Sequence, residues 1–235
     1  MTGTPVDPAG CLILVPYLDS ILTACEVGLR ALEARGYAVR RDGGTDAIDH
    51  KRSRLATQVL EEPYDEFLWI DSDMKFDPDD VDRLRSHRLP LIGGFYAARG
   101  SRDLNCRPLL GTAEIAFGPG SAPVEVHSLA TGFLLTHRTV YEDIVRKLEL
   151  PWCGASSGEL VVPYFLPMVY EDPEHGMAYL SEDYAFCGRA RQAGHKVLLD
   201  PSIRLWHIGS YGYGWEDVGA PIQRRPGGKV QLRRR

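Results

Sequence analysis

Short apolar segments alternate with segments expected to be helical along the first part of the chain, and this alternation limits the folds open to it. The apolar segments are residues 11–16, 37–41, 66–71 and 89–97, and the segments expected to be helical are 20–36, 47–62 and 77–87. Strands that alternate with helices are typical of a parallel sheet covered by helices on both faces. We therefore predict an α/β fold with a mostly parallel central sheet.

The second half of the sequence is less regular. Residues 107–136 alternate short β-like runs with Gly and Pro turns, which indicates a smaller antiparallel excursion. Helices are expected at 137–150 and 181–194, strands at 195–200 and 202–209, and mostly loop at 151–180. Asp77 and Ser181 are the expected N-caps, and Gly36 and Gly194 the expected helix ends.

Composition bounds the class of protein. The chain has 235 residues, of which 44% are hydrophobic and 25% charged, and this balance suits a globular domain. Its apolar runs are shorter than the roughly 18–20 residues of a membrane span, and its first residues lack a basic signal region. A cytoplasmic location is the resulting expectation. Five cysteines without a C-x-x-C pair indicate neither a disulfide framework nor a zinc site.

Basic residues gather at the end of the chain. Residues 222–235 contain six basic and no acidic residues, although the net charge of the whole chain is −5. We expect one domain over 1–221 and a basic, flexible tail over 222–235. Peripheral contact with an anionic membrane surface or an acidic partner is compatible with this tail, whereas stable nucleic-acid binding is not expected. A homodimer is left open.

Two acids follow the apolar run "FLWI" directly. Asp71 and Asp73 would share one face of an extended chain, and paired carboxylates suit Mg²⁺ or Mn²⁺. A chance occurrence of Asp-x-Asp is the alternative. A buried strand that ends in unpaired acids is costly without a cation, which favours the metal. Tyr17 and Asp42 follow the first two strands, so three strand ends would bring polar groups to one rim, as at a nucleotide site.

A second group of polar residues lies more than a hundred positions later. Glu182 and Asp183 begin the expected helix 181–194, where they either complement the helix dipole or supply a general base. His207 lies late in an apolar strand and is either structural or a third metal ligand. Because the Asp-x-Asp pair is also present, we interpret His207 as a metal ligand.

The motifs "VPYLDS", "FLWIDSDMKFDPDDVDRL", "PLIGGFYAAR", "LATGFLLTHRTVYE" and "SEDYAFCGRARQAGHKVLLDPSIRLWHIG" occur in this order over residues 11–210. In this series the chain resembles the GT-A fold glycosyltransferases, especially the family 2-like group. The resemblance implies a single GT-A (Rossmann-like) domain. It also implies metal-dependent transfer of a sugar from a nucleoside diphosphate sugar, with UDP-sugar favoured, to a hydroxyl acceptor with inversion.

The resemblance also implies roles for individual residues. The nucleotide would lie on Pro16, Tyr17 and Asp42, and Arg52, from the helix before the Asp-x-Asp strand, would lie near the diphosphate. The donor site would include Ser72, Gly94 and Tyr96, with Gly132 in its floor. The metal ligands would be Asp71, Asp73 and His207, and the base would be Asp183, beside Glu182. Arg52 is followed by Ser53 where the family has an Arg-Asn pair, so the exact diphosphate contact differs.

Aromatic residues alternate with glycines after His207, in "GSYGYGWED". Tyr211 and Trp215 are interpreted as a lid that covers the donor and excludes water, and a surface loop with incidental aromatics is the alternative. Other functions also stay open. They are a retaining glycosyltransferase, a nucleotidyltransferase acting on sugar phosphates, and a binding module without catalysis. The nucleotidyltransferase is less favoured because "VPYLDSIL" has no glycine or lysine for a phosphate loop.

Overall fold

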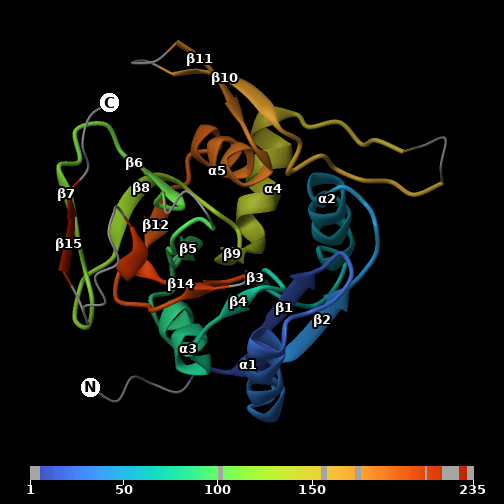
Figure 1. The fold of residues 1–235 in the computed structure, drawn as a ribbon. Helices are drawn as coiled ribbons and strands as arrows, with labels where there is room; N and C mark the ends of the chain where they lie inside the picture. Colours follow the sequence, from blue (N-terminus) through green and yellow to red (C-terminus); the bar gives the residue numbers. More distant parts are fainter. Residues whose placement is uncertain are drawn as a thin grey trace.

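The computed structural model describes residues 6–99, 103–154, 158–172, 176–209, 211–218 and 228–231. An eight-stranded sheet with the order β2-β1-β3-β9-β5-β12-β8-β6 forms the centre (Figure 1). Its strands are β1 (Cys11–Pro16), β2 (Ala38–Asp42), β3 (Glu66–Ile70), β5 (Leu91–Gly93), β6 (Cys106–Pro108), β8 (Val124–Leu129), β9 (Phe133–His137) and β12 (Val197–Leu199). Only β9 and β8 run against the others in this sheet. The predicted α/β class and the antiparallel excursion are confirmed.

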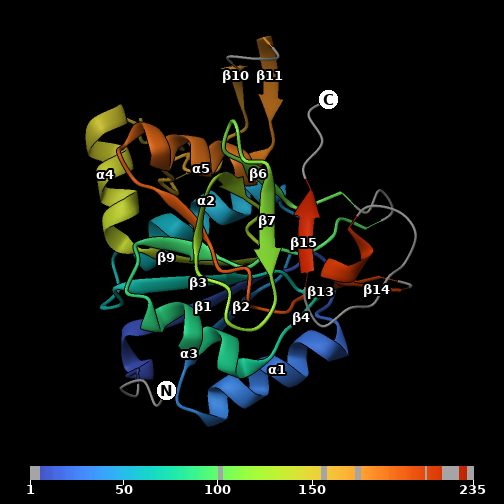
Figure 2. The same cartoon turned by 90° about the vertical axis from the view of Figure 1, so that its left-hand side faces the viewer.

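Helices cover both faces of this sheet (Figures 1 and 2). They are α1 (Thr23–Ala34), α2 (Ile48–Val59), α3 (Pro78–Ser86), α4 (Arg138–Leu148) and α5 (Glu182–Gln192). Side chains alternate along β1, so Leu12 and Leu14 pack in the core with α2, α4 and α5, whereas Ile13 and Val15 pack in the core with α1 and α3. The strand is therefore buried on both faces.

Local signals place most helix ends where the sequence predicts them. The Asp77 carboxylate accepts a hydrogen bond from the Asp79 backbone N–H, and Pro78 is the first residue of α3. Gly36 and Gly194 follow α1 and α5 with φ values of 94° and 93°, a backbone conformation that residues with a Cβ atom rarely adopt. Ser181 precedes α5, but its side chain makes no capping hydrogen bond, contrary to expectation.

Several segments differ from the prediction. Residues expected to be loop contain a hairpin of β10 (Met168–Asp172) and β11 (Gly176–Leu180). The predicted strand at 89–97 is limited to β5, and the one at 202–209 to β13 (Trp206–Ile208), which pairs with β4 (Met74–Lys75) and β14 (Gly212–Tyr213) in a separate small sheet. No helix in the described ranges has the length and apolar character needed to span a bilayer.

Part of the expected basic tail forms a strand. Gly228–Gln231 is β15, which pairs antiparallel with β7 (Glu114–Phe117) through backbone hydrogen bonds. The flexibility of the tail stays a prediction. The rest of the expected tail lies outside the described residues.

A buried hydrogen-bond chain joins the central strand to α4 and gives a first prediction. Trp69 Nε1 donates to the Tyr141 hydroxyl at 2.8 Å, and Tyr141 is 3.0 Å from Thr136 Oγ1. In Tyr141→Phe the indole N–H loses its acceptor, so the free energy of unfolding should fall by about 1–3 kcal/mol. Urea denaturation measures the change. Tyr179→Phe, at a side chain 74% exposed, is the control and should be neutral, and equal effects of both variants would contradict the prediction.

Candidate active site

A cleft of about 370 Å³ lies where the predicted rim should be, at the carboxyl ends of β1 and β3. It brings together many of the predicted site residues: Pro16, Tyr17, Arg52, Asp71, Ser72, Asp73, Glu182 and Asp183. β1 and β3 are parallel neighbours in the sheet, so the loops after them meet at one edge. The first turn of α5 closes the cleft and brings in carboxylates from far along the chain.

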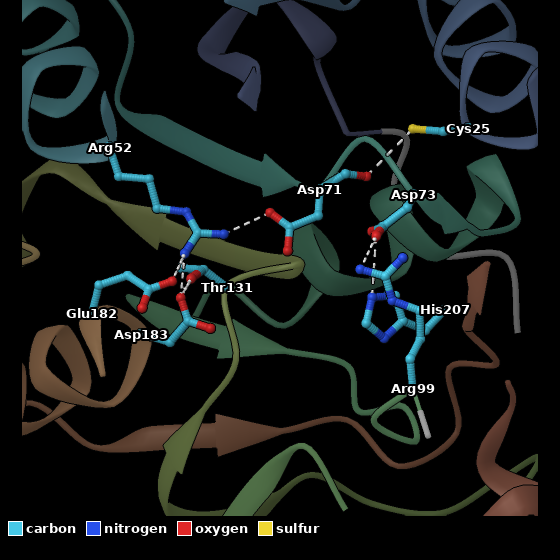
Figure 3. Close-up of polar contacts among 9 residues, drawn as sticks. All are labelled: Cys25, Arg52, Asp71, Asp73, Arg99, Thr131, Glu182, Asp183 and His207. Carbon is cyan, nitrogen blue, oxygen red and sulfur yellow. Dashed lines mark hydrogen bonds and ion pairs between the residues drawn. The ribbon is translucent and has the colours of Figure 1, made fainter. Parts of the chain in front are cut away.

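Arg52, on α2, connects the two groups of acids (Figure 3). Its Nη2 donates to Asp71 Oδ1 at 2.6 Å, and its Nη1 donates to Glu182 Oε1 at 2.9 Å and also to Asp183 Oδ1. Arg52 is only 2% exposed. Thr131 Oγ1 donates to the same oxygen of Asp183. One buried guanidinium thus holds three carboxylates from β3 and α5 around it, and we call these four residues the Arg52 cluster.

Negative charge dominates the cluster. Burial, and then the charge of Asp183, raise the pKa of Glu182 above its ordinary value. Burial is also the largest cause of the raised pKa of Asp71, against the opposing attraction of Arg52. Burial would lower the pKa of Arg52, but Asp183, Asp71 and Glu182 outweigh it and raise that pKa. The guanidinium therefore stays charged, while burial disfavours the ionised forms of Asp71 and Glu182.

Asp73 and His207 form a second contact at the cleft. His207 Nε2 lies 3.2 Å from Asp73 Oδ2, and Arg99 Nη2 lies 3.1 Å from the same oxygen (Figure 3). Burial opposes ionisation of Asp73, but the hydrogen bond from His207 and the charge of Arg99 lower its pKa. The Tyr96 and His207 rings pack in a T-shaped arrangement, with centroids 5.2 Å apart. The structure thus brings Asp73, His207 and Tyr96 together.

The local geometry of the Asp-x-Asp motif differs from the extended chain assumed for it. The Met74 N–H donates to the Asp71 carbonyl oxygen at 3.1 Å, which makes residues 71–74 a turn. Asp71 points to Arg52 and Asp73 to His207 (Figure 3). The two carboxylates consequently do not act as a pair on one face of a strand.

The donor atoms at Asp73 fit a divalent cation in part. The 3.2 Å between Asp73 Oδ2 and His207 Nε2 is near the spacing of adjacent ligands around an octahedral ion with bonds of about 2.1 Å. His207 Nδ1 is buried and has no hydrogen-bond partner in the described part of the chain. No group of three His, Cys, Asp or Glu side chains is arranged to hold a metal among the described residues. The protein would supply two ligands, which is common for Mg²⁺ and Mn²⁺ at phosphate sites.

Lys51 is an important residue that the sequence analysis missed. Its side chain is buried, and Nζ donates to the carbonyl oxygens of Tyr17 and Gly44, each at 2.7 Å. It thereby ties together the loops after β1 and β2, which form one wall of the cleft. A signal for it exists, because two consecutive basic residues in the first half of a helix oppose the helix dipole. Such a pair indicates specific partners beyond the helix.

Gly132 leaves room for the polar groups behind the cleft. A Cβ atom at this position would lie 2.2 Å from the Tyr96 hydroxyl and 3.0 Å from Asp71 Oδ2. Only glycine therefore lets these two groups approach the β9 backbone. Gly94 is similarly crowded, but by Leu205 Cδ1 at 2.6 Å, so its role is packing in the core.

Seven predicted residues are not part of the cleft lining: Asp42, Gly94, Tyr96, Gly132, His207, Tyr211 and Trp215. Three of them are engaged elsewhere. Asp42 is the last residue of β2 and pairs with Arg54 at 2.6 Å. The Tyr211 hydroxyl donates to Asp217 at 3.2 Å. Trp215 is 3% exposed and packs on Phe117 with centroids 5.1 Å apart. This position inside the core gives no support to Trp215 as part of a lid, because the ring would have to leave its packing to reach a ligand.

No family model and no curated protein sequence matches this chain. Among solved structures, A197 from STIV is similar over 96% of this chain and 97% of its own, with 16% identity and a TM-score of 0.59. This likeness shows a shared fold.

Weaker likenesses involve enzymes of two kinds. GalNAc-T7 with UDP, GalNAc and Mn²⁺ is 12% identical over 85% of this chain and 44% of that chain, with a TM-score of 0.44. UDP-glucose pyrophosphorylase complexed with UDP-glucose is 7% identical over 83% of this chain and 92% of that chain, with a TM-score of 0.41. These TM-scores are too low to decide between the two kinds of enzyme.

Loss of the Arg52 guanidinium should lower the free energy of unfolding, because the carboxylates around it then repel one another. Arg52→Gln removes a buried cation from three partly buried carboxylates and should cost about 3–5 kcal/mol at pH 7. Because the pKa of Glu182 is already raised in the folded protein, its contribution to stability is present at low pH and is lost as the pH rises above its ordinary value of 4.5. The variant should therefore lose less stability at pH 5 than at pH 7.

Urea denaturation at both pH values tests this prediction. The control is Arg30→Gln, which removes two ion pairs of an exposed side chain on α1 and should change stability by less than about 1 kcal/mol at either pH. A loss in Arg52→Gln that does not depend on pH would contradict the electrostatic account of the cluster.

A single added methyl group should disturb the cleft. Gly132→Ala places Cβ against the Tyr96 hydroxyl and should cost about 1–3 kcal/mol, and Tyr96→Phe in the same chain should recover part of this loss. Chemical denaturation of both variants measures the coupling. Gly188→Ala, whose Cβ would meet its nearest atom at 3.7 Å, is the matched control and should not destabilise. Equal stabilities of Gly132→Ala and the parent protein would refute the crowding.

Proposed function

We propose that this protein is a metal-dependent glycosyltransferase that moves a sugar from a nucleoside diphosphate sugar to a hydroxyl acceptor. A UDP-sugar donor and inversion of the anomeric centre are favoured by the resemblance of the motifs. The observation that carries the proposal is the Arg52 cluster, which unites the acid that follows β3 with the two acids that begin α5 in one cleft. That cleft also lies where ligands bind on sheets of this kind.

The charge of the cleft supports a divalent cation. Five carboxylates and two cationic side chains line it: Asp46, Asp71, Asp73, Glu182 and Asp183, with Lys51 and Arg52. A diphosphate would be repelled by this excess of negative charge unless a cation came with it. Both cations are already engaged, Lys51 by carbonyl oxygens and Arg52 by carboxylates. The nucleotide and the metal are thus expected to bind together.

Asp73 and His207 are the residues proposed to hold this cation, with the diphosphate and water as its other ligands. When bound, the metal would supply Lewis-acid stabilisation of the charge on the leaving diphosphate. Arg99 shares Asp73 Oδ2 with His207, and its side chain is half exposed. A divalent ion would therefore compete with an exposed guanidinium, which costs less to displace than a buried one.

Asp183 is proposed as the base that accepts the proton of the acceptor hydroxyl. Arg52 and Thr131 both hold one of its oxygens, and Figure 3 shows the other turned away from them. This hold fixes the direction of the carboxylate, as general-base catalysis requires. Glu182 lies beside it and shares Arg52, so we assign it the supporting role of keeping the guanidinium in place.

A donor panel tests the proposal. The purified protein with Mn²⁺ is given UDP-, GDP- and other nucleotide sugars, and the released nucleoside diphosphate is measured. Asp73→Asn and His207→Gln should each weaken Mn²⁺-dependent UDP binding in calorimetry by at least about tenfold, because each removes a charged or ligating contact. Asp79→Asn, which removes an exposed acid on α3, is the control and should bind normally.

The outcomes separate the candidate functions. Release of the nucleoside diphosphate from a nucleotide sugar, dependent on Asp73, supports the glycosyltransferase. Release of pyrophosphate from a nucleoside triphosphate and a sugar phosphate would instead establish the nucleotidyltransferase. Normal metal and nucleotide binding by Asp73→Asn would refute the site.

A further inference from the structure

A second cavity, of about 570 Å³, lies on the side of α2 opposite the cleft. Ile48, Lys51 and Arg52 line the cleft, whereas Asp49, His50 and Ser53 line the second cavity, as expected for two faces of one helix. Its other walls come from the chain between α4 and β10 and from α5. Figure 1 shows the chain after α4 running beside α2. The volume lies in the range of about 300–1,000 Å³ typical of small-molecule sites.

The walls of this cavity are mostly apolar and are held by hydrogen bonds. Apolar lining side chains are Leu150, Pro151, Val161, Pro163 and Leu166. The Phe165 N–H donates to Ser53 Oγ and the Val162 N–H to Thr57 Oγ1, both at 3.0 Å, so residues 161–166 are fixed to α2. Cys153 and Val161 exchange two backbone hydrogen bonds. A cavity fixed in this way is preformed, which lowers the entropic cost of binding.

Arg189 brings a positive charge to these apolar walls and has no carboxylate partner among the described residues. This residue, on α5, is 8% exposed. Its Nη1 donates to the carbonyl oxygens of Tyr164 at 3.2 Å and Leu166 at 2.6 Å, and in the described ranges no carboxylate forms an ion pair with it. Burial alone lowers the pKa of Arg189. A buried cation without a counter-ion is unfavourable and would gain from an anionic partner.

The carboxylates that line the cavity do not serve as counter-ions of Arg189. Glu159 is exposed and accepts a hydrogen bond from Gln58 Nε2 at 3.2 Å. Asp49 lies in the first turn of α2, where the helix dipole stabilises it. Neither is within ion-pair distance of Arg189. The contrast with the Arg52 cluster is clear, since there one guanidinium faces three carboxylates.

We propose that the second cavity binds a compact, mostly apolar molecule with a single anionic group. The anion would lie on the guanidinium of Arg189, and the apolar body would pack on Leu150, Val161 and Leu166. The inference does not rest on the function proposed for the cleft, because it uses a different face of α2. A nucleotide sugar is a poor match here, since its many hydroxyl groups would lose water against apolar walls.

Binding of a fluorescent anion tests the site. The probe is 8-anilinonaphthalene-1-sulfonate, which combines aromatic rings with one sulfonate. Its fluorescence should rise to saturation at one site per chain, and decanoate should displace it at a concentration at least about tenfold lower than decanol, because the alcohol lacks the charge. Equal displacement by acid and alcohol would overturn the role of Arg189.

Variants locate the bound probe. Arg189→Met should weaken probe binding by at least about tenfold. Arg191→Met, on the same helix but paired with Glu125 outside the cavity, is the matched control and should bind as the parent does. Because Arg189 also holds two carbonyl oxygens, a second variant avoids it. Leu166 is 51% exposed, so Leu166→Trp should fold normally, as checked by circular dichroism, and should fill the cavity and abolish binding.

Two results would overturn the proposal. One is unchanged probe binding by a folded Leu166→Trp or Arg189→Met protein. The other is displacement of the probe by UDP with Mn²⁺ in the parent protein together with loss of probe binding in Asp73→Asn, which would place the probe in the cleft instead.

Discussion

The buried guanidinium of Arg52 is the interaction on which the cleft depends. It joins α2 to the end of β3 and to the first turn of α5, elements separated by up to 131 residues in the sequence. A lysine could not replace it, because a point charge cannot direct separate N–H groups at carboxylates on two sides. The interaction is also unbalanced, with more negative than positive charge around it.

The same imbalance accounts for the arrangement around Asp73. Arg99 and His207 both approach one of its oxygens, so the acid that lies outside the Arg52 cluster has its own positive partners. The two acids of the Asp-x-Asp motif thus have different partners although they are two residues apart. The turn at 71–74 makes this division, because it directs Asp71 to α2 and Asp73 to β13.

Much of this arrangement follows from local patterns in the sequence, and the rest depends on contacts between distant segments. Strand and helix positions, the Asp77 cap and the gathering of acids at strand ends were predictable, because periodicity and capping act over a few residues. The turn after Ile70, the carbonyl acceptors of Lys51 and the burial of Trp215 depend on tertiary contacts. Trp215 is instructive, since alternating glycines and aromatics indicate a mobile loop, yet Phe95 and Phe117 bury the ring.

Helix α2 explains how one element can serve two sites. Its consecutive residues Lys51, Arg52 and Ser53 are all buried, although polar residues usually cover the exposed face of a helix. Lys51 donates hydrogen bonds to the loops after β1 and β2, and Arg52 pairs with the acids at β3 and α5. Ser53 accepts a hydrogen bond from the backbone of the segment before β10. A helix bonded on three sides cannot shift toward one partner without loosening another. Any ligand that reorients α2 from the second cavity would therefore act directly on the position of Arg52 in the cleft.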